Sequence, residues 1–165
     1  MNIKEKVLRF LETDCRYSAK NIADAIDVTE QEVADVIAGC IDDGTILGYK
    51  ALINWDKTER EFVTALIEVK VTPQRGNGFD KIAERIYSLE EVKAVYLMSG
   101  GFDLTVIIEA KSLKDIAFFV SDKLSPINAV TSTATHFVLK KYKDHGIILE
   151  NEEEEFKRME FPDLV

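Results

Sequence analysis

A change in the spacing of apolar residues near residue 62 constrains the fold more than any other feature of the sequence. Before it, apolar residues recur at helical spacing, as in "IKEKVLRFLET" (3–13), where Ile3, Val7 and Phe10 share one face. After it they alternate, as in "FVTALIEVKV" (62–71), where every second residue is apolar. The two periods predict a helical first part followed by a part that contains a sheet.

The first part reads as three short helices. Ser18 is suited to cap the second helix, and the Thr29–Glu32 pair fits a capping box at the start of the third, which Gly44 ends. Only "DVT" (27–29) separates these two helices, and so short a connection forces a steep crossing. We therefore predict a helix-turn-helix domain over residues 1–50 and an extended linker over 51–61.

The second part, residues 62–142, has the order strand, helix, strand, strand, helix, strand. "VKAVYLM" (92–98) and "LTVIIEA" (104–110) flank the tight turn "SGGFD", and "AVTSTATHFVLKK" (129–141) is the last strand. This βαββαβ order describes a ferredoxin-like sandwich with both helices on one sheet face. The predicted fold class is α+β: an N-terminal helix-turn-helix, winged-helix-like domain followed by a ferredoxin-like βαββαβ domain.

The uncovered sheet face predicts a second copy of the chain. Its expected apolar members are Phe62, Leu66, Ile107, Phe137 and Leu139. A sheet face of this kind is normally covered. We expect a homo-oligomer in which a second subunit covers this face.

Charge and cysteine content exclude several classes of protein. The net charge is −9, and residues 1–60, 61–146 and 147–165 carry −4, 0 and −5, so over half of the excess lies in the expected acidic tail (143–165), predicted to be mobile or loosely docked. No apolar run could span a bilayer and no signal peptide opens the sequence, so we expect a cytoplasmic protein with no membrane partner. Cys15 and Cys40 suggest two reduced thiols near a core rather than a disulfide or zinc site, and no cofactor or metal is indicated.

Three motifs follow one another along the chain, "DDGTILGY" (42–49), "SGGFDLTV" (99–106) and "TSTATHFVL" (131–139). Together with the two-domain order they resemble the leucine-responsive/asparagine-regulator (Lrp/AsnC) family of transcription factors. The first is similar to the family's E-x-G-x-I-x-G-Y segment, the second to its T/S-G-x-Y/F-D-x-x-L/V turn and the third to its T-x-T-x-x-V-L ending. The resemblance covers residues 1 to about 142. It implies a homodimer, often assembled into tetramers or octamers, that binds double-stranded, pseudo-palindromic DNA and senses an amino acid or a similar small molecule through its ferredoxin-like domain.

The resemblance assigns effector binding to the turn and to the last strand. The turn glycines can expose amides that hold a carboxylate, and an aspartate can accept from an ammonium group. The opposing interpretation is a hairpin turn that its aspartate merely caps. The candidate effector residues are Ser99, Gly100, Gly101, Phe102, Asp103, Thr131, Thr133 and Thr135.

The third helix departs from the family pattern V-x-x-R-V-x-x-L-E, because "VADVIAGCI" (33–41) has Val36 at the arginine position. From Asn21 to Tyr49 the chain has seven acids and no base, although phosphate neutralisation supplies most non-specific DNA affinity. Gln31 can pair with adenine, and an acid can accept from cytosine N4. The candidate DNA-binding residues are Arg16, Ser18, Lys20, Thr29, Glu30, Gln31, Ala34, Asp35 and Lys50, of which Arg16, Lys20 and Lys50 are expected at the backbone.

Three alternatives stay open at this stage. The acidic third helix is also consistent with a docking module that does not bind DNA. The architecture also resembles sirohaem decarboxylases, for which only His136 and His145 could serve as ligands or general bases, although a lone strand histidine is more often structural. A free-standing interaction protein could instead fold its acidic tail onto "KKYK" (140–143). No catalytic residues are predicted, because no catalytic constellation appears.

Overall fold

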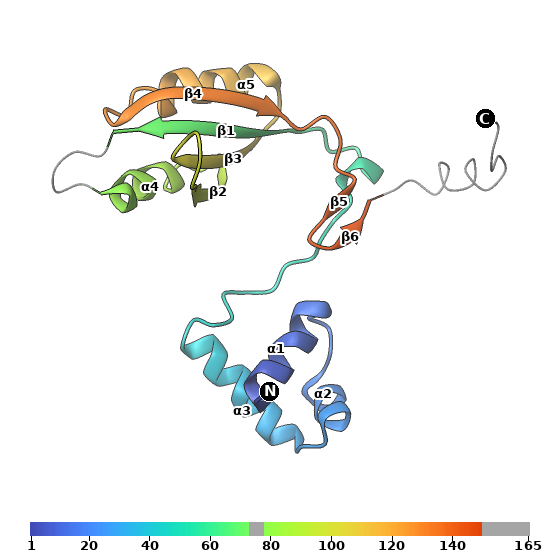
Figure 1. The fold of residues 1–165 in the computed structure, drawn as a ribbon. Helices are drawn as coiled ribbons and strands as arrows, with labels where there is room; N and C mark the ends of the chain where they lie inside the picture. The colour runs from blue at the N-terminus through green and yellow to red at the C-terminus, as the bar shows by residue number, and fades with distance from the viewer. Residues whose placement is uncertain (73–77, 150–165) are drawn as a thin grey trace, which may run out of the picture. The chain divides into compact units, whose positions relative to one another are not determined.

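The computed structural model describes residues 1–72 and 78–149, and the chain divides into two compact units between Ile53 and Asn54 (Figure 1). The α+β class and the order of its two parts are confirmed. In the described ranges no helix is long and apolar enough to cross a membrane.

The first unit consists of helices α1 (Ile3–Thr13), α2 (Ala19–Ile26) and α3 (Glu30–Asp42). Ser18 caps α2 and Thr29 caps α3 as predicted, each within a capping box. The connection between α2 and α3 turns at Asp27, whose φ of 58° is left-handed. Val7, Ile22, Ala23 and Val33 are buried together where the three helices meet.

Residues 46–53, which lead toward the second unit, contain no helix or strand, and Gly48 adopts a positive φ of 155° there. Cys15 is a correction to the prediction of two thiols near a core, since it is exposed while Cys40 is buried.

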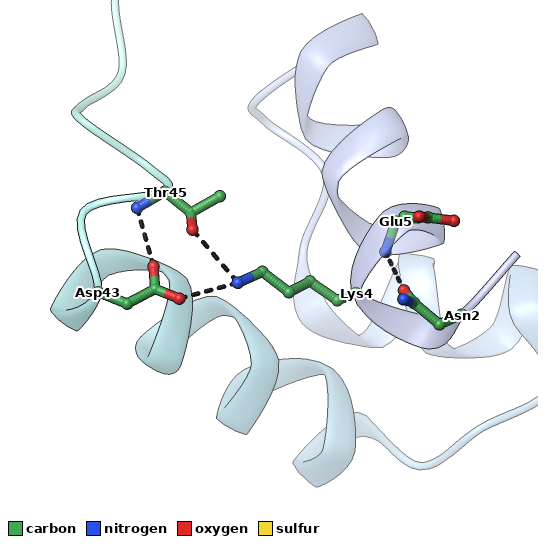
Figure 2. A network of polar contacts seen from close by, with 5 residues as sticks. All are labelled: Asn2, Lys4, Glu5, Asp43 and Thr45. Atoms are coloured by element: carbon green, nitrogen blue, oxygen red, sulfur yellow. Dashed lines mark hydrogen bonds and ion pairs between the residues drawn. The ribbon is translucent and has the colours of Figure 1, made fainter.

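A polar network holds the end of α3 to the start of α1 (Figure 2). Lys4 Nζ lies 2.8 Å from Asp43 Oδ2 and 3.2 Å from Thr45 Oγ1, while the Thr45 amide donates to Asp43 Oδ1 at 2.8 Å. The Lys4 ammonium and the two Thr45 donors hold the pKa of the Asp43 carboxyl at about 2. The network thereby fixes the helix on which DNA reading would depend.

The second unit is a four-stranded antiparallel sheet with the order β2-β3-β1-β4. Its strands are β1 (Val63–Val71), β2 (Val92–Leu97), β3 (Leu104–Ala110) and β4 (Val130–Phe137). Helices α4 (Phe79–Tyr87) and α5 (Leu113–Phe118) pack on one face, and α5 continues as a π-helix, η2 (Phe119–Leu124). Their buried residues cover Ala65, Ile67, Val69 and Val71, so the ferredoxin-like prediction is confirmed.

The other sheet face carries half-exposed Leu66 and Ile107, which are direct partners across β1 and β3. The expected place of Phe137 on this face is wrong. Phe137 pairs with Ala65, whose side chain is buried under the helices, so the register puts Phe137 on the helix-covered side. Phe62 and Leu139 lie outside the strands, and Phe62 packs edge-on against Trp55 with ring centroids 6.5 Å apart.

Two expected irregular segments are partly ordered. The linker over 51–61 contains a 3-10 turn, η1 (Trp55–Lys57), and Arg60 stacks 4.4 Å from the Trp55 ring centroid and 5.3 Å from that of Phe62. The tail begins with a hairpin of β5 (Lys143–Asp144) and β6 (Ile147–Ile148), which Gly146 at φ 84° allows to turn. The acidic block that follows lies outside the described residues.

The Asp43 network predicts a pH-dependent stability of the first unit. Because the pKa of Asp43 is about 2 in the folded chain against its ordinary 3.8, the contribution of the ion pair is complete above about pH 4 and is lost as the pH falls toward 2. Asp43→Asn should therefore unfold at lower denaturant concentration than the wild type at pH 7, and the two midpoints should converge near pH 2.

The measurement is chemical denaturation read at the backbone amide signals of Val7 and Val33, which report the core of this unit. Asp24→Asn is the matched control, because Asp24 is exposed on α2 and its carboxylate has no ion-pair partner among the described residues. A difference between Asp43→Asn and wild type that stays constant from pH 7 to pH 2 would contradict the role of the network.

Candidate functional site

The turn between β2 and β3 is fixed to the end of β1 through Asp103. The Val71 amide donates to Asp103 Oδ2 at 2.8 Å, the Asp103 amide donates to the Val69 carbonyl at 3.1 Å, and the Met98 amide donates to the Asp103 carbonyl at 2.8 Å. Asp103 is half-buried, and its Oδ1 has no hydrogen-bond partner among the residues the structure describes. Asp103 thus caps the turn and still presents one carboxylate oxygen.

The middle of this turn presents unused donors. Gly100 and Gly101 are exposed, Phe102 is half-buried, and none of their three amides donates a hydrogen bond within the described part of the chain. Neither glycine has a positive φ, and a Cβ added at either would meet nothing within 4 Å. The sequence suggests that glycine is needed here for a tight turn. This interpretation is wrong, because an L residue would fit both positions of the single chain.

The structure brings only one of the three candidate threonines to this end of the sheet. Thr131 Oγ1 donates to the Lys70 carbonyl at 3.1 Å, one residue from the amide that Asp103 caps. Thr133 and Thr135 pair with Val69 and Ile67, so they lie farther along β4 on the helix-covered side, half-buried. Ser99 is exposed at the start of the turn.

Two of the candidate DNA-binding residues have their hydroxyls engaged in helix caps. Ser18 Oγ accepts from the Asn21 amide at 3.1 Å and donates to Asn21 Oδ1 at 2.6 Å. Thr29 Oγ1 accepts from the Glu32 amide at 3.2 Å and donates to Glu32 Oε2 at 2.7 Å. These bonds from Thr29 lower the pKa of the Glu32 carboxyl.

The solvent face of α3 carries a side-chain pair next to its first turn. Gln31 Nε2 donates to Asp35 Oδ1 at 2.8 Å, and both residues are exposed. Glu30 is also exposed, and Ala34 is half-buried beside the pair. This face therefore combines a fixed amide with acidic oxygens and no cation.

The three candidate cations are not equivalent. Arg16 is exposed, but its Nε and Nη2 lie 2.9 and 2.7 Å from the Asp14 carboxylate, and this bidentate contact lowers the pKa of Asp14 to about 2. Lys20 and Lys50 are exposed and have no ion-pair partner among the described residues. Lysine charge near the helix-turn-helix is therefore more available than the arginine.

The two histidines belong to different sheets and share no contact that the structure records. His136 lies in β4 on the open sheet face, with Nε2 3.3 Å from Glu68 Oε1, and His145 lies in the β5–β6 turn, 2.8 Å from Asp144. Within the described ranges, no three His, Cys, Asp or Glu side chains gather as a metal site. Within the described chain, the two histidines therefore do not form a joint set of ligands for sirohaem.

Sequence reasoning missed three contacts that shape the first unit. The Gln31–Asp35 bond has a local signal in its i,i+4 spacing. The Asp14–Arg16 contact lies outside any helix, so no helical spacing rule predicts it, and the Lys4–Asp43 pair joins residues 39 apart and has no local signal.

Comparison with known proteins agrees with both units. The family model described as "Lrp/AsnC ligand binding domain" matches residues 64–148. The HTH-type transcriptional regulator YugG of Bacillus subtilis (strain 168) is 47% identical over 154 residues, which cover 91% of this chain and 93% of YugG.

Two solved structures share the fold over most of both chains. The leucine response regulatory protein LrpA of Mycobacterium tuberculosis is similar at TM-score 0.73 and 18% identity, covering 91% of this chain and 99% of that one. The transcriptional regulator NMB0573 of Neisseria meningitidis, solved as a complex with L-Met, is similar at TM-score 0.70 and 19% identity, covering 87% and 93%.

The motifs, the sheet order, the family model and the relative at 47% identity agree. The chain belongs to the Lrp/AsnC family, whose relatives include HTH-type transcriptional regulators.

Proposed function

We propose that this protein is a DNA-binding transcriptional regulator that responds to an amino acid and works as a homo-oligomer in the cytoplasm. The observation that carries the proposal is the joint presence of a helix-turn-helix unit and a turn with unused donors beside a carboxylate oxygen, in a chain of the Lrp/AsnC family. The solved relative in complex with L-Met supports the choice of an amino acid as the effector class.

The turn offers both halves of an amino-acid site. The free amides of Gly100 to Phe102 suit a carboxylate, and Asp103 Oδ1 suits an ammonium group. Thr131 lies at the same end of β1, whereas Thr133 and Thr135 contribute only if the ligand extends along β4. The fold of the single chain does not require glycine at these positions. Glycine there is consistent with a ligand that comes close to the backbone from outside the chain.

The helix-turn-helix unit supplies few phosphate contacts. Lys20 and Lys50 carry free charge, and Arg16 can reach a phosphate only in competition with Asp14. Each neutralised phosphate contributes about −0.9 to the slope of log affinity against log salt concentration, so a shallow slope is expected. We assign base contacts to the exposed start of α3, where Glu30, Gln31 and Asp35 lie and helix-turn-helix proteins contact base edges.

The open sheet face is the proposed oligomer contact. Leu66 and Ile107 are apolar neighbours at its centre, and Ala94 and Ala134 give small flanks that a second copy can approach. Glu68 and His136 form a pair on the same face. A second copy would cover this face in the way that the helices cover the other.

Effector binding is tested by Asp103→Asn, which keeps an acceptor for the Val71 amide and removes the charge. We expect the affinity for the amino acid that binds best to fall at least about tenfold, because the ammonium group loses its charged partner. Isothermal titration with single amino acids measures this, with Asp80→Asn as a surface control. The sensing role fails if no amino acid binds wild type or if Asp103→Asn binds equally well.

DNA binding is tested with a duplex from upstream of the protein's own gene, at several salt concentrations. Lys20→Gln should weaken binding and reduce the salt slope by about 0.9 per copy, or about 1.8 for a homodimer. Fluorescence anisotropy gives the slope, and Lys111→Gln in the other unit should leave it unchanged. Absence of binding even at low salt would support the docking-module alternative.

Oligomerisation is tested by Ile107→Glu, which places a charge at the centre of the open face. Burying that carboxylate against a second copy has no compensating partner at this position, so the variant should be monomeric at concentrations where wild type is a dimer or larger. Light scattering after gel filtration measures the mass. Leu113→Glu, at a residue 56% exposed on α5, is the control. A wild-type monomer, or an unchanged mass for Ile107→Glu, would refute this interface.

A further inference from the structure

We propose that Asp35 orients Gln31 so that α3 selects adenine and rejects guanine at one position of the operator. The inference rests on the proposed DNA-binding function and adds a positioning role for an acid that otherwise only repels phosphate. Its starting point is the 2.8 Å bond from Gln31 Nε2 to Asp35 Oδ1 on the exposed face of α3.

The pair lies where a recognition helix reaches base edges. Gln31 is the second residue of α3 and Asp35 the sixth, so the i,i+4 spacing places them on one stripe of the helix. Ala38 continues that stripe one turn later, and a Cβ built at Gly39 meets nothing within 4 Å. The next turn of this stripe, at Ala38 and Gly39, therefore carries no long side chain that would hold a base edge away from the pair.

The bond to Asp35 determines which groups of the Gln31 amide remain free. One Nε2–H points to the carboxylate, which leaves one N–H donor and the Oε1 acceptor. Adenine offers in the major groove one acceptor, N7, and one donor, N6–H₂, and this combination matches the free groups. A flipped amide would place Oε1 against the Asp35 carboxylate, so the charge maintains this orientation.

Guanine requires a different set of groups. Its major-groove edge offers two acceptors, N7 and O6, and two donors are needed to satisfy them. Gln31 has only one donor left while Asp35 is bound, and the nearby carboxylate repels both acceptors of the guanine edge. Asp35 therefore acts as a repulsive element that gives specificity without adding affinity.

The arginine position of the family pattern strengthens this assignment. Val36 occupies it, and α3 has no Lys or Arg, so nothing on the helix can make the bidentate cation contact with guanine. An adenine read by Gln31 is thus the strongest direct contact that the side chains of α3 can make.

The test is selection of binding sites from a randomised duplex library with the full-length protein, followed by anisotropy on single-base variants of the enriched site. Wild type should prefer adenine over guanine at one position per half-site by about tenfold to a hundredfold. Asp35→Ala should reduce that preference to a few-fold, because both Gln31 N–H groups become free. Asp35→Glu, which restores a carboxylate within reach, should recover most of it.

Asp42→Ala removes the same charge from the same helix and serves as the matched control. It should strengthen binding to all sequences about equally and leave the base preference unchanged. If wild type enriches a site but Asp35→Ala keeps the same adenine preference, the role of Asp35 is overturned while the DNA-binding function stands. If wild type binds DNA but enriches no sequence, this inference fails while DNA binding stands; if it binds no duplex even at low salt, the DNA-binding function and this inference fail together.

Discussion

Strand β1 is the element on which the second unit depends, because it is hydrogen-bonded along both edges. It pairs with β3 on one side and with β4 on the other, and its inward side chains form the centre of the helix-covered core. The same strand fixes the candidate ligand groups, since Asp103 binds the Val71 amide and Thr131 binds the Lys70 carbonyl. A ligand group held by Asp103 Oδ1 would therefore be connected to the end of β1 through the hydrogen bond between Asp103 Oδ2 and the Val71 amide.

The acidic character of the first unit is partly a structural requirement. Glu32 completes the cap of α3, Asp43 ties α3 to Lys4, and Asp35 holds Gln31. Asp14 holds Arg16 in the same way. Each of these four carboxylates thus has a local role. Two of the six Lys and Arg residues that precede Trp55, Lys4 and Arg16, are engaged in the ion pairs. The ion pairs that order this unit therefore leave fewer cations for contacts with phosphates.

The sequence predicted those features that depend on periodicity and on local capping. The caps at Ser18 and Thr29, the inward face of β1 and the βαββαβ order all follow from residues close together in the chain. The place of Phe137 depended on the register between β1 and β4, and the Lys4–Asp43 pair depended on tertiary packing, so neither followed from spacing. The candidate turn was found by its motif, but the free amides that give it chemical meaning were visible only in three dimensions.

The two parts of the proposed function depend on each other through affinity. Four cations of the helix-turn-helix unit have no ion pair among the described residues, namely Lys6, Arg9, Lys20 and Lys50, and the reading helix is acidic, so we expect weak binding to a single half-site. Joining two such units through the open sheet face makes the second half-site contact intramolecular, which raises the overall affinity without any new cation. In this proposal oligomerisation supplies the DNA affinity, so the repulsion between Asp35 and phosphate lowers the overall affinity only slightly. Asp35 then supplies selectivity by excluding guanine. On this reasoning the sheet unit contributes to DNA binding as much as the helices that contact the duplex.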